Sequence, residues 1–163
     1  MKRLLSLFTI AILATLGLGP VVANANGTAM ELKVLIEDTD GNGSLSADEA
    51  RAGIPLSGTV NVTVDWGDGT VEPFTTAGFK THQYATTGEK LISITGSLTH
   101  FGFTTNASAT EDGAGGYADD EMAKITEVVA WGNLDNLVKL EYAFSNAENL
   151  VSVPNYFPAN VTD

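Results

Sequence analysis

The densest group of potential metal-binding side chains in this sequence lies in one short stretch, DTDGNGSLSADE, from Asp38 to Glu49. Oxygen-bearing residues recur at alternate positions and a glutamate closes the series, which is the spacing by which a single loop wraps around a calcium ion. The candidate ligands are Asp38, Asp40, Asn42, Ser44, Ser46 and Glu49. Gly43 stands at position 6, where such a loop turns sharply. The stretch therefore predicts a structural Ca²⁺ site.

All twelve positions fit the EF-hand loop, and the alternative interpretation is a solvated acidic turn that holds no ion. The flanks disfavour a paired EF-hand, because MELKVLI at 30–36 is typical of a strand. Only SADEARAG at 46–53 favours a helix, with Ser46 as its cap. Leu45, at position 8, is expected to pack inward. A single loop of the extracellular kind binds calcium at ~10⁻⁴–10⁻³ M.

Two other acidic residues, Asp65 and Asp68, could be taken for a pair of catalytic carboxylates. We expect them instead to cap a tight turn by accepting hydrogen bonds from backbone N–H groups, as aspartate does in turns generally. His82 and Tyr84 are expected to brace the same turn. His100 is interpreted as an ordinary strand residue. With no cysteine and no G-x-S-x-G motif in the sequence, we predict no catalytic residues and no enzymatic activity.

The elements that must position these residues are mostly short strands. Val60, Val62 and Val64 alternate with polar residues, which indicates a strand with one buried face. Asp68-Gly69 then predicts a tight hairpin turn, since glycine tolerates positive φ. Further strands are expected at 71–74, 90–95 and 98–103. Several short strands joined by turns rich in Gly and Thr favour a mainly β fold of the sandwich type.

The N-terminus reads as a targeting segment. A basic start, an apolar stretch and Ala23-Asn24-Ala25 predict a secretory signal peptide at 1–25, cut before Asn26. A membrane anchor is the alternative, but the apolar stretch is short for a bilayer that needs ~20 apolar residues. We therefore expect a secreted or cell-surface protein with no membrane span once the signal is removed.

The C-terminal third changes character. The segment 104–123 is rich in glycine and acidic residues and is interpreted as a linker. In 124–163, apolar residues recur in steps of three and four, at Leu137, Leu140, Phe144, Ala147, Leu150 and Val153. Asn160 follows Asn136 after 24 residues, within the ~20–29 residue period of leucine-rich repeats. An amphipathic helix over 137–147 is the alternative.

The charge composition of the chain restricts the classes of partner that it is expected to bind. Eight basic residues stand against twenty acidic ones, giving a net charge of −12. Such a charge repels nucleic acid and anionic lipid and attracts cations or basic partners. Without cysteine, no disulfide can stabilise an exported chain, and calcium could take that structural role.

Residues 64–96 carry a family resemblance. VDWGDGT at 64–70, then His82-x-Tyr84, then TGEKLISITG at 87–96 resemble the PKD domain, an immunoglobulin-like β-sandwich of secreted and surface proteins. Lys90 departs from the aromatic residue usual in such domains. The resemblance implies a PKD-like sandwich at 26–103 that includes the calcium loop.

The segment 125–163, with WGNL, L-x-x-A-F and A-x-N-L-x-S-V-P, looks like the BspA-type leucine-rich repeats of bacterial surface proteins. Together the two resemblances imply a PKD-like sandwich followed by the start of a leucine-rich repeat solenoid, truncated after its first repeat. They imply a non-catalytic adhesion or binding protein with an extracellular protein or polysaccharide as ligand. An accessory module of a secreted polysaccharide-degrading enzyme, and a calcium-responsive spacer, are the alternatives. We expect the backbone amides from about Ile125 onward to be weakly protected from hydrogen exchange.

Overall fold

The computed structural model describes residues 29–104 and 118–162, and the predicted signal peptide and most of the predicted linker lie outside these ranges. The expectation of a mainly β fold is confirmed. The strands are β1 (Met30–Ile36), β2 (Arg51–Asp65), β3 (Val71–Phe74), β4 (Gly78–Gln83), β5 (Gly88–Phe101) and β6 (Ile125–Ala130). Two short helices, α1 (Ala47–Ala50) and α2 (Ala118–Met122), accompany them.

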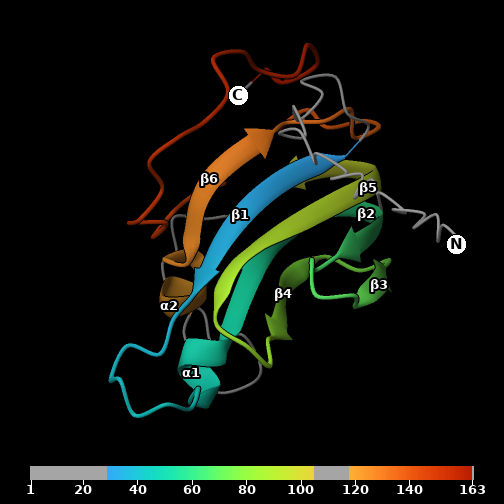
Figure 1. Cartoon of the computed structure of the whole chain (residues 1–163). Helices are drawn as coiled ribbons and strands as arrows, with labels where there is room; N and C mark the ends of the chain where they lie inside the picture. The colour runs from blue at the N-terminus through green and yellow to red at the C-terminus, as the bar shows by residue number, and fades with distance from the viewer. Residues whose placement is uncertain (1–28, 105–117, 163) are drawn as a thin grey trace, which may run out of the picture.

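These strands form one antiparallel sheet with the order β3-β2-β5-β1-β6, and β4 pairs with the first half of β2 (Figure 1). Neighbours in the sheet come from distant parts of the sequence, since β1 lies between β5 and β6. Lys33 ties these three strands together, with Nζ 3.1 Å from Glu127 and 3.5 Å from Glu89. The carboxylates of these partners, Glu127 above all, raise the pKa of Lys33.

Two strands are longer than the sequence predicts. The stretch 90–95 and the first four residues of 98–103, expected as separate strands, belong to the single strand β5, which contains Gly96 at a φ of +107° and ends before residues 102–103. The helix expected over 46–53 is only α1, because β2 begins at Arg51 and its first half pairs with β4. Strand β4 was not predicted, because burial does not alternate along it and its residues show no period of two.

Alternate residues of β1 and of the second half of β2 enter the core, whereas residues 52–57 of β2 are all buried, so the sheet is covered on both faces there. Alternate residues of β1 are fully buried, namely Met30, Leu32, Val34 and Ile36. The largest side chains of the core are Trp66 and Trp131, which are both buried, in keeping with the large share of a small core that aromatic side chains supply. One continuous cluster of buried residues runs from β1 through β6 to Leu134, Leu137 and Ala143.

The segment predicted as the first repeat begins inside this sheet. β6 pairs with β1, and Ile125 and Val128 are buried in the shared core. We therefore expect protection from hydrogen exchange to extend through β6, in place of the weak protection predicted from about Ile125 onward, and a hydrogen-exchange measurement decides between the two. Helix α2 lies within the range interpreted as a linker, at its C-terminal end.

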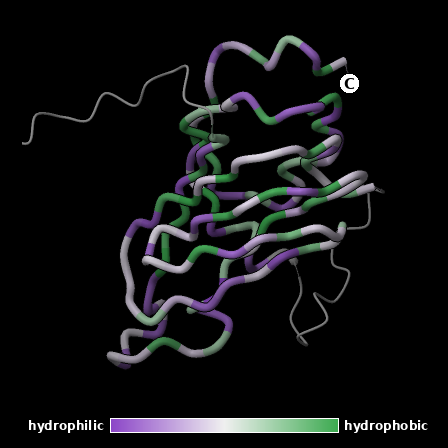
Figure 2. The backbone as a smooth tube through the Cα atoms, turned by 90° about the vertical axis from the view of Figure 1, so that its right-hand side faces the viewer, coloured by the Kyte–Doolittle hydropathy of each residue, from purple (hydrophilic) through white to green (hydrophobic). Residues whose placement is uncertain are grey.

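Residues 131–162, which we call the C-terminal coil, wind past the sheet edge in turns without a regular strand or helix (Figure 2). Two backbone hydrogen bonds recur at nearly equal intervals. The Val151 N–H donates to the Thr126 oxygen, and the Thr162 N–H donates to the Val138 oxygen, 25 and 24 residues apart. The coil also pairs in parallel with the end of β5, at His100 and Lys139.

Candidate metal site

The calcium-loop candidate is held between two fixed ends. The loop follows β1, which ends at Ile36, and precedes α1, whose N-cap is Ser46. Ser46 Oγ accepts from the Glu49 N–H, and the Glu49 carboxylate accepts from the Ser46 N–H at 2.9 Å, which completes a capping box. Leu45 packs against the core as expected. The helix cap predicted at Ser46 is confirmed.

Three of the predicted ligands converge. Oxygens of Asp38, Asp40 and Glu49 lie within 4.8 Å of one another, a spacing that suits a shared cation. Asn42 is held beside them, since its backbone N–H donates to Asp40 at 3.0 Å and its Nδ2 donates to the same carboxylate at 2.7 Å. Gly43 adopts a φ of +86°, the left-handed conformation that a turn at this position needs.

Ser44 and Ser46 are turned toward other partners. Ser44 Oγ donates to Asn42 Oδ1 at 2.6 Å, so its side chain supports the loop from within. The hydroxyl of Ser46 is engaged by the helix cap. The structure thus brings together the carboxylates at loop positions 1, 3 and 12, and leaves the two serines as supports.

Glu49 is the most strongly fixed carboxylate of the loop. Its Oε1 accepts from the Thr39 hydroxyl at 2.6 Å and from the Thr39 N–H at 2.7 Å. These bonds from Thr39, followed by those from Ser46, lower the pKa of Glu49 to about 2. Oε1 also accepts from the Asp40 N–H, so a cation bound by Glu49 would replace part of these hydrogen bonds. Its negative charge is retained at any physiological pH.

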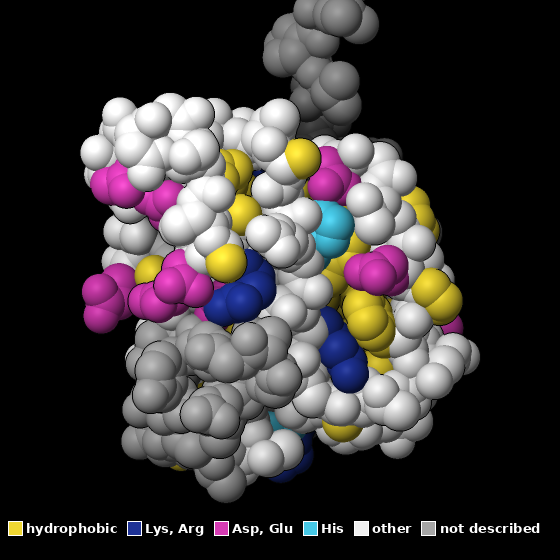
Figure 3. Space-filling view, turned by 90° about the horizontal axis from the view of Figure 1, so that it is seen from below, with side chains coloured by type: hydrophobic (Ala, Val, Ile, Leu, Met, Phe, Trp, Pro, Cys, Tyr) yellow, Lys and Arg dark blue, Asp and Glu magenta, His cyan; other side chains and the backbone are white. Residues whose placement is uncertain are grey.

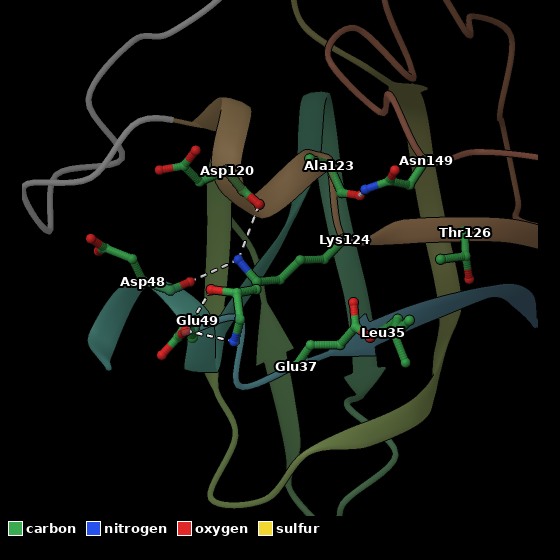
Figure 4. Close-up of a pocket in the computed structure, with 10 residues that line it drawn as sticks. Leu35, Glu37, Asp48, Glu49, Asp120, Ala123, Lys124, Thr126 and Asn149 are labelled. Carbon is green, nitrogen blue, oxygen red and sulfur yellow. Dashed lines mark hydrogen bonds between the residues drawn. The ribbon is translucent and has the colours of Figure 1, made fainter. Parts of the chain in front are cut away.

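A cavity of about 480 Å³ adjoins the loop, between α1, α2 and the middle of the C-terminal coil at Asn149 (Figure 4). Lys124 reaches into it and donates to the backbone oxygens of Asp48 at 2.7 Å and Asp120 at 3.1 Å. Burial lowers the pKa of Lys124. Seen from this end of the molecule, acidic side chains gather beside a basic one (Figure 3). Sequence reasoning missed Lys124, because its partners are backbone oxygens that no motif marks.

The second acidic pair behaves as a turn cap. Asp65 Oδ1 accepts from the Gly67 N–H and Asp68 Oδ1 from the Thr70 N–H, both at 2.9 Å, as expected. His82 Nε2 lies 2.7 Å from Asp68 Oδ2. Partial burial opposes ionisation of Asp68, but the bonds from His82 and Thr70 outweigh it and lower its pKa to about 2.

Aromatic packing completes this turn. The His82 ring stacks on Trp66 with centroids 5.0 Å apart and meets Tyr84 edge-on at 4.7 Å. The Tyr84 hydroxyl donates to the Trp66 backbone oxygen, and burial raises the Tyr84 pKa. The bracing role predicted for His82 and Tyr84 is confirmed by these contacts. His100, by contrast, has a partner that the sequence did not suggest, because its Nε2 donates to the Glu141 oxygen of the coil at 2.9 Å.

Compared with family models, curated proteins and solved structures, the chain matches none of them. Within residues 29–104 and 118–162, no helix combines the length and the hydrophobicity that a bilayer crossing requires.

Proposed function

We propose that this chain is a secreted or cell-surface, non-catalytic binding protein, in which a calcium-braced PKD-like sandwich presents leucine-rich repeats for adhesion. The observation that carries the proposal is a pair of backbone hydrogen bonds at nearly equal spacing, from the Val151 N–H to the Thr126 oxygen over 25 residues and from the Thr162 N–H to the Val138 oxygen over 24. A leucine-rich repeat solenoid stacks successive turns at a fixed period of ~20–29 residues, so these two contacts support the start of such a stack.

The apolar surface of the coil supports the same proposal. Val151 is 86% exposed and Phe157 is 66% exposed, and both lie on the last turn of the stack. With the offset of 24 residues, Leu137 of the preceding turn corresponds to Val161; Leu137 is buried, and Val161 is partly buried against the core. A repeat contributes half of a core layer and needs a neighbour to complete it. An extracellular protein is the ligand that we favour, because stacked repeats present an extended surface.

Calcium enters the proposal as a structural ion. The convergence of Asp38, Asp40 and Glu49 supports it, since three negative charges within 4.8 Å repel one another until a cation links them. A filled loop would fix the connection between β1 and β2, which are both central to the sheet. The cation would have no catalytic part.

Thermal unfolding tests the calcium component. Binding to the folded form alone stabilises by RT ln(1 + [L]/Kd), so calcium at ten times Kd should contribute roughly 1.4 kcal/mol. We expect the melting temperature to rise in millimolar calcium, and Glu49→Gln to abolish the rise. The control is Asp48→Asn, which removes a charge beside the ligands at a residue that pairs with Arg51. The calcium-dependent rise in melting temperature should persist in this variant. Equal melting of wild type and Glu49→Gln, with calcium and with chelator, would leave only an acidic turn.

The binding function is tested with purified protein on arrays of immobilised extracellular proteins and polysaccharides. Adhesion predicts calcium-dependent retention on one or more proteins and no hydrolysis of any polysaccharide. Retention on polysaccharides alone would favour the accessory-module alternative, which rests on the PKD-like resemblance. A chain that melts as predicted with calcium but is retained on nothing would favour the spacer.

A further inference from the structure

Asn42-Gly43 is the only Asn-Gly pair among the described residues, and it lies exposed in the acidic loop. Because glycine has no Cβ, its backbone nitrogen can approach the carbonyl carbon of the preceding side chain closely. No atom lies within 4 Å of the position that a Cβ of Gly43 would occupy, so space surrounds this peptide. The pair is accessible to water.

The loop supplies hydrogen-bond partners to both groups that would react. Asn42 Oδ1 accepts two hydrogen bonds from Ser44, from its N–H at 2.9 Å and from its hydroxyl at 2.6 Å. Two donors on one carbonyl oxygen stabilise the charge that develops there when the carbon is attacked. The Gly43 N–H donates to Asp38 Oδ2 at 2.7 Å, within reach of proton transfer to a base.

We propose that Asn42 is a site of spontaneous deamidation, promoted by Asp38 as base and Ser44 as oxyanion donor. The Gly43 nitrogen attacks the Asn42 side-chain carbon and passes its proton to Asp38. The bond to Nδ2 then breaks, and Nδ2 leaves as ammonia after it takes up that proton. The resulting succinimide is opened by water, and position 42 becomes an aspartate or an isoaspartate. No oxidant or reductant takes part.

A cation in the loop would oppose this reaction, and this step rests on the calcium site proposed above. At loop positions 1 and 5, Asp38 and Asn42 would turn their oxygens to the ion and away from Gly43 and Ser44. Loops that fill soon after export would keep Asn42. Loops that stay empty would acquire either a further carboxylate or an isoaspartate, whose longer backbone spoils the spacing of the ligands.

The test is to incubate the purified chain in chelator and to follow the Asn, Asp and isoaspartate forms of the loop by peptide mapping. A free synthetic peptide with the sequence of residues 38–46 is the reference. We expect conversion in the folded chain at least as fast as in the peptide. Asp38→Asn and Ser44→Ala should each slow it several-fold, and Asp48→Asn should leave it unchanged. Conversion far slower than in the peptide, or unaffected by Asp38→Asn and Ser44→Ala, would overturn the proposal.

A second arm adds millimolar calcium and separates the two proposals. Slower conversion together with a raised melting temperature supports both. A raised melting temperature with an unchanged rate of conversion overturns the protective effect. If calcium changes neither quantity, the metal site fails, and the rates in chelator still decide on deamidation by themselves.

Discussion

The sheet and the C-terminal coil share one core but are held in place by different means. In the sheet, neighbouring strands form antiparallel ladders. The ladder between β2 and β5, for example, covers Leu56–Ser57 and Val60–Asp65 of β2, with an irregularity between Ser57 and Val60. In the coil, three isolated parallel bridges and a series of tight turns take the place of ladders. Val151, Val153 and Phe157 remain exposed there. Ladders of backbone hydrogen bonds therefore order the sheet, whereas the coil, which adds Leu134, Leu137 and Ala143 to the shared core, is ordered by its contacts with β5 and β6.

The largest expected effect comes from the interior of the sheet region. Trp66 is fully buried, stacks on His82 and donates from Nε1 to Glu72 at 2.7 Å. Trp66→Ala should lower the free energy of unfolding by about 3–5 kcal/mol, as deletions of buried aromatic side chains do. Denaturant unfolding measures it, and Trp66→Phe, which refills part of the space, should lose less. A loss below about 1 kcal/mol for Trp66→Ala would contradict the packing described here.

The next effect concerns the junction between the two regions. Gly132 has a φ of +64°, and a Cβ there would lie 2.2 Å from the Ala29 backbone carbon. Because backbone atoms cannot move aside cheaply, Gly132→Ala should cost roughly 1–3 kcal/mol and loosen the coil. Hydrogen exchange should quicken at Val138 and Val151 and stay slow at Val62.

A matched control for this junction is Gly69→Ala. Gly69 has a φ of +96°, but no atom lies within 4 Å of a Cβ placed there, so only the conformational strain is shared. Equal exchange in the coil of both variants would mean that Gly132 does not hold the coil to the sheet.

Local patterns predicted the parts of this molecule whose causes are local. The alternation at Val60, Val62 and Val64 predicted the second half of β2, and Asp68-Gly69 predicted the turn before β3. The carboxylates of the loop at 38–49 could be predicted to converge, because their spacing in the sequence determines how the loop brings them together. In each case residues a few positions apart determine the outcome.

What the sequence could not predict depends on distant contacts. The pairing of Lys33 with Glu127 joins strands from opposite ends of the chain, and nothing near either residue marks its partner. The bond from His100 to the Glu141 oxygen is of the same kind. The cavity at Lys124 needs four segments to meet. The periodicity of side chains describes one helix or strand at a time, so it does not predict contacts between distant segments.

Acid should affect the sheet region more than the coil. The carboxyls of Asp68 and Glu49, whose pKa values are lowered to about 2, both lie in residues 29–104. A carboxyl with a lowered pKa stabilises the fold above its unfolded pKa, near 4, and this contribution is lost as the pH falls toward 2. Thermal unfolding measured from pH 5 to pH 2 should show a falling midpoint. Asp68→Asn should lower the midpoint at pH 5 and flatten the fall, and an unchanged slope would contradict this assignment.

The smallest effect is expected for Val151 on the exposed side of the coil, and it is measured against that of a buried valine, Val128. Val128 is 1% exposed and Val151 is 86% exposed, although both take part in the same parallel contact. Val128→Ala removes two buried methyl groups and should cost roughly 2 kcal/mol. Val151→Ala should change the free energy of unfolding by less than about 0.5 kcal/mol, because its side chain has no neighbours to lose. Denaturant unfolding of the two variants side by side measures both. If Val151→Ala costs as much as Val128→Ala, another surface must cover the last turn in solution, and the coil would then be as complete as the sheet.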